Sequence, residues 1–364
     1  MTIRATEQMR LTGRNDKGPS QITTITAGSG NAGQILVTTP VLDLLGGAIF
    51  ANTGAAGNAG SIMIETGQLS LADDALIASR SVQNATGNAG SVNLQVTGLF
   101  SSQASAVSTE ALQGAGGNVS ITAGNMNLNS GTTISAKSAG SEDAGNIAFT
   151  SATDLLMRNS TVTTFAANAS GGDIKLTAPN LIRIVDSTIT SSVQGQAGSD
   201  GGNINIDPQL VVIQSSQLLA NANAGAGGNI NVAASGAVLV DPNSLLNASA
   251  GPAGVSGSVN INAPIQILSG ALVPLNLAYS QAGLSGDRCA ADPQGQFSSF
   301  VQTGRDGVPQ VPGALSPSPL SFLDTLTSGS LGSQWPNVAA VRLGLDSVSF
   351  DDSTLFRFHS ACRS

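Results

Sequence analysis

The chain has 364 residues, of which only 10% are charged and 3% are aromatic, and its formal net charge is −8. A globular enzyme usually carries about a quarter of charged residues, so the 44 glycines and 41% apolar residues favour a repeat array over a compact enzyme or a disordered chain. An acidic chain with three lysines also excludes nucleic acid and anionic membranes as partners, because both require basic patches.

The first residues already fit a repeating pattern of short strands. Residues 2–5 are typical of one strand and residues 22–25 of a later strand in the same unit. No apolar signal-peptide core follows the first methionine. We therefore expect that the chain starts inside a repeat and that an upstream part, with its signal peptide, is missing.

A glycine, one small polar residue and an Ile or Val then recur nine times, and we call the apolar residue the first anchor. Successive first anchors lie 26 to 30 residues apart, on average 28. Such a period is the signature of a solenoid. The first anchors are Ile35, Ile62, Val92, Val119, Ile147, Ile174, Ile204, Ile230 and Val259.

Two further apolar positions follow each first anchor. An apolar patch lies 7 to 10 residues later in most copies, as at Leu69 and Leu71. A second anchor lies 15 residues later in the first eight copies, and length varies only in the Gly/Ala/Asn/Ser-rich remainder, as expected for a loop. The second anchors are Phe50, Ile77, Val107, Ile134, Val162, Ile189, Leu219 and Leu245.

Three short strands per copy predict one rung of a right-handed parallel β-helix. Apolar and polar residues alternate around the anchors, as in Ile204-Asn205-Ile206, which is typical of half-buried strands. Each strand would pair with its equivalent in the next rung about 4.8 Å away, so that nine to ten rungs form a rod of about 40 Å. We expect the glycine before each anchor to make a tight turn with positive φ. A β-sandwich or propeller is the alternative, but a propeller blade needs four strands.

The array is predicted to cover residues 1–280. The last 84 residues differ, because they hold six of the ten Phe and the only Trp. Residues 281–320 are rich in Pro and Gly and are predicted to form an extended tail. Residues 321–364 form a small apolar segment that we expect to act as a cap, because an open solenoid end invites aggregation.

Short motifs in the array and tail resemble a known family. Gly-Gly-Asn-Ile occurs at 201–204 and 227–230, and Ser-Thr-Ile-Thr-Ser occurs at 187–191. In the tail, Ser-Gly-Asp-Arg-Cys-Ala (285–290), Phe-Ser-Ser-Phe (297–300) and Gly-Arg-Asp-Gly-Val-Pro (304–309) follow one another. Together they resemble large exoproteins of the filamentous haemagglutinin type, which use two-partner secretion.

This resemblance implies a secreted or outer-membrane surface protein, exported through an outer-membrane transporter and contacting glycans or proteins of host or neighbouring cells. Members serve adhesion, aggregation or haem acquisition. The family's N-terminal secretion domain is absent here, and residues 321–364 do not match the family pattern. An exported chain could join Cys289 and Cys362, its only cysteines, so we hypothesise a disulfide between them.

Candidate catalytic residues were sought because β-helices also occur among polysaccharide lyases and hydrolases. Asp74 and Asp186 share one offset from the first anchor but lie four rungs apart, about 19 Å. Asp186 and Asp241 lie two rungs apart, about 10 Å, near the spacing of about 6.5–9.5 Å in inverting glycosidases. Arg183 is the only cation near them in sequence. We interpret all three carboxylates as solvated turn residues and predict no catalytic site.

No cofactor or metal is predicted either. His359 is the only histidine and has no Cys, Asp or Glu cluster around it, and no His or Tyr pair suggests haem ligation. The favoured hypothesis is a non-catalytic, adhesin-like rod. A carbohydrate-active enzyme and a non-functional gene fragment remain alternatives, which turnover on polysaccharides and an upstream reading frame with a neighbouring transporter gene would distinguish.

Overall fold

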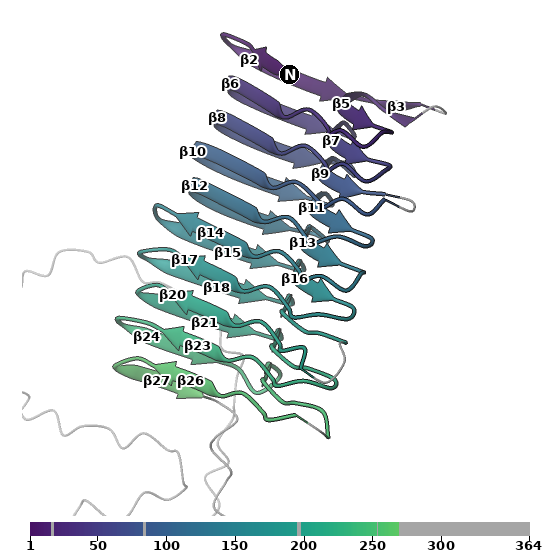
Figure 1. The fold of residues 1–364 in the computed structure, drawn as a ribbon. Coiled ribbons are helices and arrows are strands. Elements are labelled where there is room, and N and C mark those ends of the chain that lie inside the picture. Colours follow the sequence, from purple (N-terminus) through teal and green to yellow (C-terminus); the bar gives the residue numbers. More distant parts are fainter. Residues whose placement is uncertain (16–17, 83–84, 195–197, 253, 269–364) are drawn as a thin grey trace, which may run out of the picture. The chain divides into compact units, whose positions relative to one another are not determined.

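The predicted parallel β-helix is confirmed. The computed structural model describes residues 1–15, 18–82, 85–194, 198–252 and 254–268, and every regular element in these ranges is a β-strand. Apart from one small hairpin, the named strands pair in parallel with their equivalents in the next rung. Figure 1 shows nine complete rungs and a partial tenth stacked in chain order. No helix of the described residues is long and apolar enough to cross a membrane.

The first rungs contain long strands. Rung one consists of β1 (Thr2–Arg4), β2 (Gln8–Thr12) and β5 (Gln21–Thr26), and its loop carries the hairpin of β3 (Arg14–Asn15) and β4 (Gly18–Pro19). Rungs two to five each have one long strand and one short strand. They are β6 (Ile35–Leu45) with β7 (Ala48–Thr53), β8 (Ile62–Ala72) with β9 (Leu76–Ser81), β10 (Val92–Gln103) with β11 (Ala106–Ala111), and β12 (Val119–Asn129) with β13 (Thr133–Ser138).

From rung six the long strand divides into two. Rungs six to nine are β14 (Ile147–Ser151), β15 (Asp154–Arg158) and β16 (Thr161–Ala166); β17 (Ile174–Thr177), β18 (Leu181–Val185) and β19 (Thr188–Thr190); β20 (Ile204–Asp207), β21 (Leu210–Gln214) and β22 (Gln217–Leu219); and β23 (Ile230–Ala233), β24 (Ala237–Val240) and β25 (Leu245–Asn247). Rung ten has β26 (Val259–Asn262) and β27 (Ile265–Leu268).

These strands form three faces. The first face starts at the first anchors and the second face follows it, and both belong to one 16-stranded sheet because the long strands run through both. The third face is a separate nine-stranded sheet from β5 to β25. One apolar cluster fills the space between the faces along the whole array, with Phe100 and Phe149 as its largest fully buried side chains.

The first anchors are buried from rung two to rung nine, as predicted, but three second anchors were wrong. Phe50, Leu219 and Leu245 point outward, and Ile49, Leu218 and Leu246 occupy the matching inward positions. The turn before the third face varies by one residue among rungs. A one-residue slip moves a side chain to the opposite face of its strand, so a fixed offset of 15 fails in these rungs.

The glycine column was predicted correctly in position but not in cause. None of the glycines two residues before the first anchors has the positive φ that we expected. Instead, each stacks on its equivalent in the rung before it. A Cβ on Gly145 would lie 1.9 Å from the Gly117 oxygen, and one on Gly172 would lie 2.0 Å from the Gly145 oxygen. The rungs therefore approach so closely at this corner that only glycine fits.

The apolar interior ends at rung ten. Gln266 takes the inward position that Val238 holds in rung nine. Its side-chain amide donates to the carbonyl oxygens of Ile261 and Ala263 at 3.2 and 3.3 Å. The predicted boundary at residue 280 and the segments 281–320 and 321–364 lie outside the described residues.

Candidate functional site

The turn between the second and third faces positions all three candidate carboxylates. In six consecutive rungs this turn contains a non-glycine residue with φ between 46° and 61°. Such left-handed backbone is unfavourable for most residues, and Asp and Asn tolerate it best. Gly46 takes the place in rung two with a φ of 69°. The column in rungs three to eight is Asp74, Ala104, Ser130, Asn159, Asp186 and Ser215.

Asp74 and Asp186 therefore share their offset for a backbone reason. Each occupies the left-handed position of its turn, and its backbone N–H donates to the next rung: Asp74 to the Ala104 oxygen at 2.9 Å and Asp186 to the Gln214 oxygen at 3.0 Å. The same position holds Ala104 and Ser130 in the rungs between them. Neither carboxylate has another candidate carboxylate in the adjacent rungs of this column.

Asp241 caps the turn of the preceding rung. Both of its carboxylate oxygens accept the Ser215 backbone N–H at 3.0 Å, and the Ser244 hydroxyl also donates to it. The Ser244 hydrogen bond is the largest cause that lowers the pKa of Asp241, and the Ser215 N–H lowers it further against an opposing effect of desolvation. A general acid in glycoside hydrolysis needs a raised pKa. Asp241 is thus suited to holding a turn rather than to donating a proton.

Arg183 does not complete a site with these carboxylates. It points outward from β18 on the second face, and its guanidinium donates to the Gln214 Oε1 atom at 3.1 Å. The only ion pair within the described part of the chain joins Arg80 and Glu110, with 3.8 Å between Nε and Oε2. Both side chains are about a third exposed, and such surface pairs contribute about 0–1 kcal/mol to stability.

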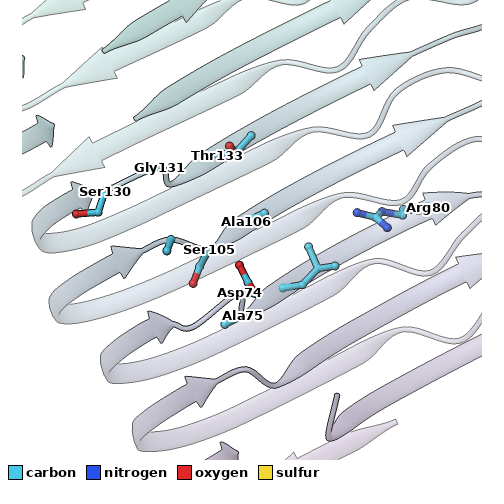
Figure 2. A pocket seen from close by; sticks show the side chains of 10 residues that line it. Asp74, Ala75, Arg80, Ser105, Ala106, Ser130, Gly131 and Thr133 are labelled. Carbon is cyan, nitrogen blue, oxygen red and sulfur yellow. The ribbon is translucent and has the colours of Figure 1, made fainter. Parts of the chain in front are cut away.

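A shallow groove of about 480 Å³ runs beside this turn column over rungs three to five. Figure 2 shows Asp74 at the turn of rung three and Arg80 farther along the third face. The groove is hollow because Ala106 lies in register between the larger Leu76 and Thr133. Its walls bring one carboxylate and one guanidinium to the surface. It lacks the second carboxylate that acid–base hydrolysis requires.

Two ladders of asparagine side chains, which sequence reasoning missed, connect the rungs outside the core. In each step, a side-chain oxygen accepts the backbone N–H of the equivalent position in the next rung, at 2.7 to 3.0 Å. The signal was present, because the residues lie at constant offsets of four or one before the first anchor. The ladders comprise Asn31, Asn58 and Asn88, and then Asn118, Asn146, Asp173, Asn203 and Asn229.

No group of three metal-ligating side chains occurs among the residues that the structure describes. The hypothesised disulfide between Cys289 and Cys362, and the single histidine His359, lie outside those residues and stay predictions. No protein-family model, curated protein or solved structure matched the chain when it was compared with them.

Proposed function

We propose that the β-helix is the non-catalytic rod of an adhesin-like exoprotein that acts at the cell surface or outside the cell. The observation that carries this proposal is that the polar turn residues are used to hold the stack together. Asp241 caps a turn, and Asp173 continues an asparagine ladder. A catalytic rung would be expected to depart from these columns and to gather acid and base groups instead.

The repeated surface supports multivalent binding. Equivalent outward positions recur about every 4.8 Å along the array, the spacing of neighbouring strands. A partner with its own repeated groups, such as a surface glycan, would bind weakly at one rung and much more tightly across several. The filamentous haemagglutinin resemblance favours export through an outer-membrane transporter and adhesion to neighbouring or host cells.

Adhesion is tested with the purified chain coupled to beads at several surface densities. We expect binding to bacterial or host cells to rise more steeply than in proportion to density, because several chains must engage together. Beads carrying a heat-unfolded preparation are the control. Absence of binding at every density, or equal binding by the unfolded control, would overturn the proposal.

The enzyme alternative is tested with the same preparation on a panel of acidic and neutral polysaccharides. We expect no release of reducing or unsaturated ends. Turnover that is abolished by Asp186→Asn or Asp241→Asn would replace the adhesin proposal with a hydrolase or lyase.

A further inference from the structure

The outer surface of the second face changes from polar to apolar along the array. In rungs three to five, seven of its nine outward positions are polar, as at Ser101 and Asn127. In rungs six to ten, most outward positions are apolar. We call these nine residues the apolar strip: Leu156, Leu181, Val185, Leu210, Val212, Ala237, Leu239, Ile265 and Ile267.

Register and exposure establish that the strip faces outward. Its central column continues that of Ser101 and Asn127, since Asn127 pairs with Leu156, Val212 with Leu239, and Leu239 with Ile267. Residues flanking Leu156, Val212 and Leu239 on their own strands are buried. Ile265 is 58% exposed, Ile267 51% and Leu156 37%. Soluble proteins rarely expose a contiguous apolar patch of this kind without a binding role.

We propose that the apolar strip is a self-association surface on which a second copy of this chain packs face to face. The strip is part of a sheet, so its side chains form ridges with a period of about 4.8 Å along the rod. A surface interdigitates with these ridges over their whole length only if it has the same period, as in the dry interfaces between paired sheets. A second copy has this period and the same apolar columns.

Two arginines determine the relative direction of the copies. Arg158 in rung six and Arg183 in rung seven point outward from one end of the strip. Parallel copies would place these guanidinium groups against each other, and like charges in contact are unfavourable. In an antiparallel pair, rung six faces rung ten and rung seven faces rung nine. Arg158 then lies opposite the apolar rung of Ile265 and Ile267, so the structure favours the antiparallel pair.

The size of the strip determines how strong the association is. Five rungs and about five residues per strand give a flat area of about 24 by 16 Å, or about 400 Å² per copy. Stable dimers bury about 800 Å² per partner. We therefore expect a weak dimer that forms at concentrations of about 100 µM and above. The net charge of −8 on each copy opposes association, so added salt should strengthen the dimer.

Sedimentation velocity of the full chain between about 5 and 500 µM tests association. We expect the average mass to rise from the monomer value of 36.1 kDa towards twice that value. The double variant Val212→Glu with Leu239→Glu should remain monomeric at all concentrations. The matched control Ser101→Glu with Asn127→Glu adds the same charges to the polar part of the same column and should associate within about twofold of the wild type. A wild-type chain that stays monomeric at 500 µM would overturn the proposal.

A photo-crosslinking amino acid in place of Ile267 gives an independent readout in a folded background. After irradiation at high concentration, mass spectrometry should find intermolecular links to rung six, between Asp154 and Arg158. Links to rung ten of the second copy would overturn the antiparallel arrangement, and links outside the apolar strip would overturn the surface itself. The cell-adhesion assay above is run at bead surfaces with other partners, so its failure leaves this result unaffected.

Discussion

The glycine column gives the sharpest test of how the rungs pack. In Gly145→Ala, the new Cβ would lie 1.9 Å from the Gly117 oxygen, whereas real Cβ contacts are essentially never below 3.0 Å. The two rungs must therefore separate locally by about 1 Å. Gly33→Ala is the matched control, because its nearest neighbour is the Thr24 Cγ2 atom at 3.7 Å and its φ is not positive.

The magnitude follows from the hydrogen bonds between these two rungs. Val119 N–H donates to the Asn146 oxygen at 2.9 Å, Gly116 N–H to the Asp143 oxygen at 2.9 Å, and Asn146 N–H to the Asn118 Oδ1 atom at 2.8 Å. A separation of about 1 Å lengthens all three beyond hydrogen-bond distance. At about 1 kcal/mol each, Gly145→Ala should lower the free energy of unfolding by about 3 kcal/mol.

Thermal unfolding followed by far-UV circular dichroism measures this difference. For a domain of this size, about 3 kcal/mol corresponds to a decrease in Tm of about 6–12 °C. Gly33→Ala should leave the Tm unchanged or raise it slightly, because alanine restricts the unfolded chain. Equal Tm values for the two variants would refute the claim that close approach, rather than turn geometry, requires glycine in this column.

Three further predictions concern polar side chains. Asn58→Ala removes the acceptor for the Asn88 N–H and should lower the free energy of unfolding by about 1 kcal/mol in urea titrations, whereas Asn58→Asp keeps the acceptor and should have a smaller effect. Asp241→Ala should lower the Tm at neutral pH. Because the Ser244 and Ser215 hydrogen bonds lower the pKa of Asp241 below its ordinary value of 3.8, its contribution is present above pH 3.8 and is lost as pH falls below it, so the Tm difference should disappear in acid. Asp186→Asn keeps a side chain that tolerates the left-handed turn and should change the Tm by under about 2 °C, whereas Asp186→Val should lower it measurably more.

The period of the sequence predicted the rungs because each inward position repeats about every 28 residues and is apolar for the same reason each time. Ile174 and Ile204 are buried and in register, as the spacing of their copies indicates. The offset of the third face was less predictable. A single residue more or fewer in the turn reverses inside and outside, and the apolar pair Leu218-Leu219 does not reveal which member faces inward.

Features that depend on the neighbouring rung could not be predicted from one copy alone. The sequence marks the glycine column, but only the stacked backbone shows that the oxygen of the preceding rung excludes a Cβ. The same holds for the candidate site. Asp186 and Asp241 looked like a spaced acid pair in sequence, and the structure shows a left-handed turn residue and a turn cap. In runs such as Leu155-Leu156-Met157, every residue is apolar, so alternation could not identify the outward Leu156.

Removing one whole rung tests most directly whether equivalent positions share one continuous interior. Deleting residues 145–171 joins Ala144 to Gly172, which is the equivalent of Gly145. We predict that this variant keeps the β-sheet circular dichroism spectrum and a cooperative thermal transition, whereas deleting residues 145–158, about half a rung, abolishes the transition by moving inward side chains out of register. Equal damage from the two deletions, or a folded half-rung variant, would contradict the stacked-rung architecture.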